Sequence, residues 1–156
     1  MQFHSVHGKN IELSQDATCA VRTSSFNYGI LFGKEPTKPD QKVTVEITNV
    51  ISGWSGGLRY GFTNVDPSTH AADNLPPYAI PNLSSKPQYH AVSLSEKHAA
   101  KGTRLSYYYT SQNTCVTFIN NKPFKTENMS KIDVTKPVWL LLDVYGCTKG
   151  IKAVVS

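Results

Sequence analysis

Hydrophobic and polar side chains alternate with a period of two along much of the chain. The clearest run covers residues 42–48, where valine and isoleucine alternate with threonine and glutamate. Residues 104–110 follow the same rule, because Leu105, Tyr107 and Tyr109 fall on one face. This period is that of a β-strand with one face toward a core and the other toward water. Both runs are therefore predicted to be half-buried strands.

Other segments predict further strands. Residues 138–145 are apolar on both faces, which predicts a strand in the centre of a sheet with Trp139 in the core. Residues 115–125 predict a hairpin, because two consecutive asparagines tolerate the positive φ of a two-residue turn, and Pro123 places the second arm at a sheet edge. Gly61, inside the strand predicted at residues 58–63, indicates either that the hydrogen-bond ladder of the sheet is weakened there or that another segment packs close to the strand. The remaining predicted strands cover residues 11–13, 20–22, 30–32, 58–63 and 151–155. Residues 11–13 and 20–22 can pair with residues 151–155.

Helical signals are weak by comparison. Residues 95–101 predict one or two helical turns, which Gly102 ends. Many short strands with no helical pattern between them indicate an all-β fold, a two-sheet antiparallel β-sandwich. Five prolines within residues 64–87 exclude a regular strand there, and a loop of this length is usually functional. Neither a repeat nor a linker is visible, so residues 1–156 are predicted to form a single domain.

Composition and charge narrow the function classes. The 156 residues are 39 % hydrophobic, 17 % charged and 10 % aromatic, which argues against a disordered chain. No apolar run approaches the ~20 residues of a membrane span. The net charge of +5 comes from scattered lysines and arginines, so the signature of a nucleic-acid-binding surface is weak. The first residues lack the basic start and apolar stretch of a secretory signal, so we expect a cytoplasmic protein.

Few groups show a recognisable catalytic or metal-binding spacing. The sequence lacks the nucleophile elbow, the phosphate-binding loop and the zinc-protease motif, so the reactions that depend on these motifs are not expected. Three separated cysteines argue against zinc and against a disulfide framework, and they suit reduced thiols. No cofactor is therefore expected. Asp143 lies in an apolar strand, where a buried carboxylate needs a partner, and we expect it to organise backbone groups or Arg59.

One constellation carries a functional signal. Residues 53–63, GWSGGLRYGFT, join a glycine-dense turn to a strand that holds a single arginine, Arg59. The proline-rich loop follows, and prolines limit the entropy lost when a loop docks a peptide. Trp54, Tyr60 and Tyr78 are candidate aromatic anchors, while Arg59 can bind a carboxylate or an amide. The alternative is that Trp54 and Arg59 only brace the loops.

These motifs resemble, in order and spacing, the Neuralized homology repeat, or NHR domain. Its features are an opening F-H…G-x-x-I, a central W-S/C-G-x-L-R-x-G-F-T-x-x-D-P, an L-P-x-Y/F…P-x-L loop and a closing W-x-x-x-D-V-Y-G-x-T-K/R-x-I. They match residues 3–11, 54–67, 75–83 and 139–151, so the resemblance covers nearly the whole chain. Tyr60 and the tyrosine run at 107–109 depart from the usual pattern, which leaves the binding preference open.

The resemblance implies a β-sandwich similar to SPRY and concanavalin-like jelly-roll domains. It implies a non-enzymatic recognition module that selects substrates for an E3 ubiquitin ligase of the Neuralized type. Any ligase activity would then lie in a RING or a partner outside this chain. The implied partner is a short cytoplasmic peptide, such as the Delta- or Jagged-type tail of a Notch ligand marked for endocytosis. The implied peptide-binding residues are Trp54, Arg59, Tyr60, Asp66, Tyr78 and Tyr145.

Two other functions stay open on the sequence. Trp54 and the tyrosines could stack on sugar rings in a lectin-like sandwich. Scattered lysines could instead bind an anionic phospholipid such as a phosphoinositide, which would hold a cytoplasmic protein at the plasma membrane or endosomes. No nucleic-acid partner is expected.

Overall fold

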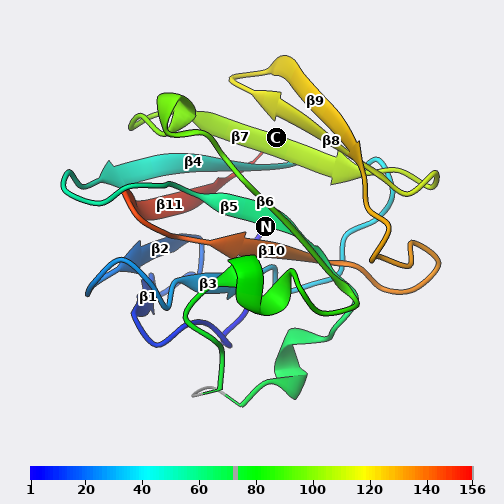
Figure 1. Ribbon diagram of the computed structural model, residues 1–156, viewed down its shortest axis with the longest axis horizontal. Coiled ribbons are helices and arrows are strands. Elements are labelled where there is room, and N and C mark those ends of the chain that lie inside the picture. Colours follow the sequence, from blue (N-terminus) through cyan, green and yellow to red (C-terminus); the bar gives the residue numbers. More distant parts are fainter. Residues whose placement is uncertain (72–73, 156) are drawn as a thin grey trace.

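Two antiparallel sheets packed face to face make up the computed structural model, which describes residues 1–71 and 74–155 (Figure 1). The larger sheet has the order β1-β2-β11-β4-β7-β8-β9, and the smaller has the order β3-β10-β5-β6. The strands are β1 (Ile11–Leu13), β2 (Cys19–Arg22), β3 (Ile30–Phe32), β4 (Val43–Val50), β5 (Arg59–Thr63), β6 (Tyr89–Ser93), β7 (Arg104–Tyr109), β8 (Thr114–Ile119), β9 (Lys122–Asn128), β10 (Trp139–Asp143) and β11 (Thr148–Val154). The predicted two-sheet sandwich is confirmed.

The inner faces of the two sheets supply the main core. The predicted core face of β4 and β7 is confirmed, since Val45 and Leu105 are fully buried. The prediction that Thr44 faces water was wrong, because Thr44 is 8 % exposed and its hydroxyl group bonds to that of Ser106 at 2.8 Å. Tyr60 and Phe62 of β5 meet Tyr107 of the opposite sheet, with ring centroids 4.9 and 5.1 Å apart. Aromatic pairs at such distances add to the stabilisation that burial of their apolar surface already provides. The rings therefore join the two layers at the centre of the sandwich.

A second, smaller core lies on the outer face of the four-stranded sheet. Strand β10 is central, as predicted, and its side chains alternate between the two cores. Leu141 points outward and packs with apolar residues of the proline-rich loop, namely Leu75, Ala79 and Leu83. The short helical segment η2 (Ala79–Leu83) lies across this sheet in Figure 1. Trp139 shares the outward register and is only half-buried, so its prediction as a core residue was wrong.

Some element boundaries differ from the predictions. Residues 95–101 contain only a single 3₁₀ turn, η3 (Glu96–His98), and a second such turn, η1 (Pro67–Thr69), opens the proline-rich loop. β1 pairs with β2 and only β2 reaches β11, while β11 begins three residues earlier than predicted. β9 does form the sheet edge. Among the described residues, no helix has the length and apolar character needed to cross a membrane.

Close approach explains the glycine inside β5. A Cβ atom on Gly61 would overlap the carbonyl oxygen of His90 in the neighbouring strand β6. Any side chain would therefore push β6 away from β5. Of the two alternatives given by the sequence, the close approach by another segment is confirmed.

Candidate functional site

Three loops meet at one end of the sandwich, at residues 23–29, 51–58 and 144–147. Main-chain hydrogen bonds tie them to one another. The N–H of Gly146 donates to Phe26 O at 3.1 Å, and the N–H of Cys147 donates to Gly56 O at 2.9 Å. Because these loops connect strands of both sheets, the bonds make a continuous surface, which we call the rim.

A buried arginine holds the rim from below. Arg22, at the end of β2, is 2 % exposed and donates to four main-chain carbonyls. Nε reaches Ser25 O at 2.6 Å, Nη1 reaches Val144 O at 2.8 Å and Thr148 O at 2.7 Å, and Nη2 reaches Gly146 O at 2.7 Å. Burial lowers the pKa of Arg22, and the negative charge of Asp143 opposes this effect. The guanidinium thus replaces water as the partner of these carbonyls, and it fixes the loop between β10 and β11.

Two glycines allow the rim loops to touch. Gly146 has φ +63°, and a Cβ atom there would lie 2.6 Å from the carbonyl oxygens of Gly56 and Ser55. Gly56 has φ +80°, and its Cβ would lie 2.7 Å from the ring of Tyr145. Both conformations are unfavourable for residues with a side chain. The glycine-dense turn in the sequence therefore serves backbone packing beneath the aromatic residues.

Four aromatic rings gather on the rim, and we call them the rim cluster. Phe26 is at its centre, with ring centroids 5.0 Å from Trp54, 6.2 Å from Tyr145 and 6.3 Å from Tyr78. The rings of Tyr78 and Tyr145 are 5.9 Å apart. Trp54 is 43 % exposed, whereas the other three are half-buried. The cluster thus presents one exposed indole on a supported aromatic base.

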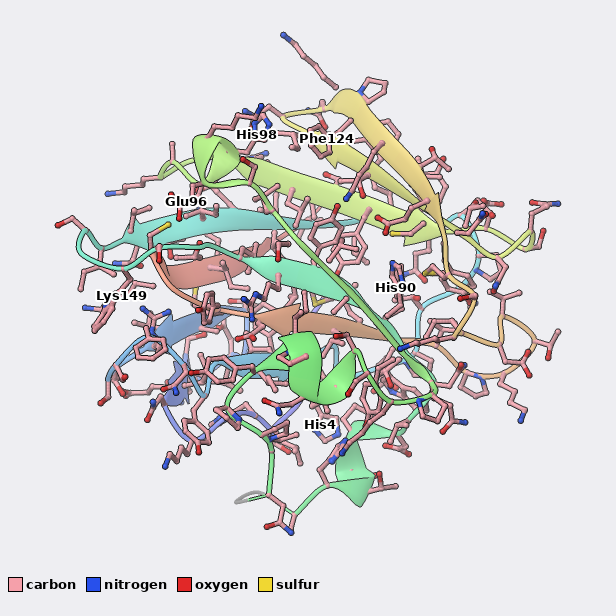
Figure 2. All side chains as sticks on the ribbon, in the orientation of Figure 1. His4, His90, Glu96, His98, Phe124 and Lys149 are labelled. Carbon is pink, nitrogen blue, oxygen red and sulfur yellow. The ribbon has the colours of Figure 1, made fainter. Side chains whose placement is uncertain are left out.

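A hollow of about 170 Å³ opens beside the exposed indole. Its wall joins Trp54 and Ile51 to a polar run at residues 23–25 and to Lys149. Figure 2 labels Lys149. Ile51 is also exposed, so an apolar surface adjoins the hydroxyl groups and the cations of Lys149 and the buried Arg22. Such a mixture of apolar wall and few polar groups is typical of a site that holds one side chain of a ligand. We call it the rim hollow.

Arg59 and Asp143 attach the proline-rich loop to the rim. They face each other across β5 and β10, and the Arg59 guanidinium lies 3.8 Å from the centre of the Tyr145 ring. Arg59 Nη1 donates to Ile80 O at 3.0 Å, while Asp143 Oδ2 accepts from the Ala79 N–H at 2.9 Å. Burial raises the pKa of Asp143 to about 6, although the Ala79 N–H and the charges of Arg59 and Arg22 oppose the rise. The prediction that Asp143 organises backbone groups is confirmed.

The structure unites four of the six predicted site residues: Trp54, Tyr78 and Tyr145 belong to the rim cluster, and Arg59 lies against the Tyr145 ring. Tyr60 was wrongly placed among them, because it is 1 % exposed and its hydroxyl group bonds to Thr117 Oγ1 at 2.9 Å inside the core. Burial raises the pKa of this phenol.

The Asp66 side chain bonds within the turn η1 and is not part of the rim cluster. Its Oδ1 accepts hydrogen bonds from the N–H and the hydroxyl of Ser68, at 2.9 and 2.8 Å, and so caps η1. Hydrogen bonds from Ser68 lower the pKa of Asp66. Its predicted peptide contact therefore has no support from its position.

Two rim residues were not selected from the sequence. Phe26 follows a run of serines, and only its match to the family pattern could have drawn attention to it. Arg22 ends the short strand predicted at residues 20–22, and an arginine at the end of a strand is ordinarily solvated. Three of its four partners are 122 to 126 positions away in the chain, so no local spacing could reveal them.

The rim offers stacking, apolar contact and hydrogen bonding. Among residues 1–71 and 74–155, no group of three or more histidine, cysteine, aspartate or glutamate side chains is arranged to hold a metal ion. The three cysteines are free, and burial raises the pKa of Cys115 to about 12, which keeps that thiol protonated. The arrangement suits binding by surface complementarity.

Comparison with solved structures supports the fold assignment. The chain superimposes on the crystal structure of the Drosophila melanogaster neuralized NHR1 domain with a TM-score of 0.93 and 36 % identity, covering 99 % of this chain and 98 % of that one. A human SPRY domain aligns with a TM-score of 0.59 at 14 % identity, over 98 % of this chain and 96 % of that one, which shows a shared fold alone. The predicted likeness to SPRY domains is confirmed.

Sequence comparison identifies the family. The model of the Neuralized family matches residues 3–155. Protein neuralized of Drosophila melanogaster is 37 % identical over 152 residues, which is 97 % of this chain and 20 % of that protein. The human E3 ubiquitin-protein ligase NEURL1B is 34 % identical over 156 residues, or 99 % of this chain and 28 % of that protein. The chain thus spans between a fifth and somewhat over a quarter of these relatives, and it belongs to the Neuralized family.

Proposed function

We propose that this chain is a protein-interaction module that recognises a short peptide of a target protein for ubiquitination. The observation that carries the proposal is the exposed Trp54, held on a supported aromatic base beside the rim hollow. Exposed aromatic anchors next to a pocket are the residues that dominate the energy of many protein interfaces. The relatives that carry the name E3 ubiquitin-protein ligase supply the cellular context.

Rigidity of the rim favours binding. Arg22 holds the loop between β10 and β11, and Arg59 with Asp143 holds the proline-rich loop, so both surfaces exist before the peptide arrives. Less conformational entropy is then lost on association. A peptide would lay an apolar side chain against Trp54 and place a hydrogen-bonding group among the hydroxyls at residues 23–25 or near Lys149.

The target follows from the family resemblance. We propose a cytoplasmic tail of the Delta or Jagged type as the first candidate, with the chain acting on the cytoplasmic side of the plasma membrane or endosomes. Transfer of ubiquitin would then depend on a RING or a partner outside these 156 residues.

Fluorescence polarisation with labelled synthetic peptides that tile Delta- and Jagged-type tails tests this proposal. At least one peptide is expected to bind, and Trp54→Ala should weaken it about tenfold or more, as expected for an anchor worth ~1.4 kcal/mol or more. Tyr78→Ala should weaken it as well, with the melting temperature of both variants near that of the wild type.

Phe124→Ala is the matched control, because Phe124 is also 43 % exposed but lies in the β9 edge strand. The proposal fails if Trp54→Ala and Tyr78→Ala bind as tightly as the wild type. It also fails if no tail peptide binds while phosphoinositide vesicles or a glycan array do so.

A further inference from the structure

A second hollow lies away from the rim cluster, between η3 and the tip of the β8–β9 hairpin. It has a volume of about 300 Å³, and apolar side chains of Ile119, Pro123 and Phe124 form much of its wall. The His98 ring packs edge-on against Phe124, with centroids 5.1 Å apart (Figure 2). We call it the hairpin hollow. Trp54 and Phe124 are the two aromatic side chains among the large exposed hydrophobic residues that the structure describes.

The side chains that line the hairpin hollow carry no negative charge. Lys122 lines it, and Lys97 and Lys101 are exposed on either side of His98 in the chain. None of the six lining residues is acidic. Glu96 is the nearest acid in sequence, but its carboxylate accepts a hydrogen bond from the Gly56 N–H of the rim. Within the described residues, none of these three lysines forms an ion pair.

The charge selects among possible occupants. A second copy of this chain, docked by twofold symmetry, would bring lysines against lysines, and the net charge of +5 adds to the repulsion. Extension of the sheet by a partner strand is also disfavoured, because Pro123 removes a donor from the β9 edge. An acidic segment meets neither obstacle, and opposite charges speed and orient its encounter.

We propose that the hairpin hollow is a second docking surface, which takes an acidic peptide segment that carries one bulky apolar side chain. The apolar side chain enters between Phe124 and His98, and the flanking carboxylates lie over Lys122, Lys97 and Lys101. The surface is separate from the rim cluster and does not depend on the proposed tail peptide. The Glu96–Gly56 hydrogen bond joins η3 directly to the loop that carries Trp54.

A titration followed by NMR tests this inference. The probe is a synthetic heptapeptide with a central phenylalanine flanked by aspartates and glutamates, added to the ¹⁵N-labelled chain at low salt. Amide shifts are expected for His98, Ile119, Asn120 and Phe124. Replacing the peptide's phenylalanine by alanine, or its acids by lysines, should abolish the shifts.

Variants of the chain separate the two surfaces. Phe124→Ala and Lys122→Glu should each weaken the acidic peptide about fivefold, as expected for loss of an apolar anchor or reversal of an exposed charge. Lys38→Glu, the same charge change at an exposed position in another loop, should have little effect. Trp54→Ala should leave the affinity unchanged.

The inference is overturned if the hairpin amides do not shift, if Lys38→Glu weakens binding as much as Lys122→Glu, or if Trp54→Ala abolishes it. Binding of phosphatidylserine vesicles by the same lysines, with no response to the peptide, would also overturn it. None of these results bears on binding of tail peptides to the rim.

Discussion

The buried carboxylate of Asp143 accepts a hydrogen bond from the main-chain N–H of Ala79, 64 positions earlier in the chain. This contact joins the central strand β10 to the proline-rich loop that carries Tyr78. A carboxylate in such a place normally resists ionisation, because burial removes the water that stabilises its charge. Because this bond holds the proline-rich loop against β10, protonation of Asp143 links the position of the loop to pH.

Comparison of the wild type with Asp143→Asn should show that the Asp143 carboxyl lowers the stability of the fold as pH rises. The pKa of Asp143 is about 6 in the folded chain, against an ordinary value of 3.8, so the folded state binds the proton more tightly between these values. The free energy of unfolding therefore falls as pH rises from the ordinary pKa of Asp143 to its pKa in the folded chain. Urea unfolding from pH 4 to 7 should show the wild type losing stability relative to the asparagine variant.

Asp16→Asn provides the opposite control. Hydrogen bonds from Ser14 and Thr18 lower the pKa of this exposed carboxyl. Its contribution to stability should therefore be lost as pH falls below its ordinary value. A flat difference between the wild type and Asp143→Asn across pH 4 to 7 would contradict the burial argument.

Arg22→Leu should destabilise the chain strongly. The substitution leaves four hydrogen bonds to main-chain carbonyls unmade, three of them buried, and unsatisfied buried groups cost about 1–3 kcal/mol each before the structure relaxes. We expect a net loss of about 3 kcal/mol or more in the free energy of unfolding, measured by chemical denaturation. Arg104→Ala removes an exposed arginine that pairs with Glu46 at 3.0 Å, and it should cost about 1 kcal/mol or less. Equal effects of the two changes would rule out the special role of Arg22.

Gly146→Ala and Gly53→Ala separate backbone conformation from loop packing. Both glycines have positive φ, +63° and +97°, so alanine is strained at each by about 1 kcal/mol. A Cβ on Gly53 would meet nothing within 4 Å, whereas one on Gly146 would strike the Gly56 carbonyl. The Gly146 variant should therefore have the lower melting temperature and weaker peptide binding. Similar melting temperatures of the two variants would mean that the rim loops can move apart to accept a side chain at little cost in stability.

Tyr60→Phe should affect stability and spare recognition. The change removes the hydroxyl group that bonds to Thr117 and leaves that side chain without its partner, at a cost of about 1 kcal/mol. Peptide affinity should be unchanged, because Tyr60 faces the core. Calorimetry and the polarisation assay measure the two effects separately. A loss of affinity without loss of stability would return Tyr60 to the binding surface.

The neighbouring residues Arg59 and Tyr60 illustrate how far the site could be predicted. The motif marks both, but successive side chains of a strand point to opposite faces, so only one can reach the rim. Tyr60 lies two residues before Phe62 in β5, so the two side chains point to the same face of the sheet, and both are buried in the core. The short turn η3 shows a similar limit. Seven residues with a favourable helical composition are too few to stabilise a helix without tertiary support.

The sequence by itself determined the period-two strands, the sandwich and the family, because alternation and ordered motifs are local properties that one chain displays directly. It also marked Trp54, Tyr78 and Tyr145. Only the tertiary structure decided that Phe26 packs against Trp54 and that Arg22 donates hydrogen bonds to four carbonyls. It likewise decided that the proline-rich loop covers a second core. These contacts join positions far apart in the chain, and their energy depends on burial that exists only after both sheets have packed.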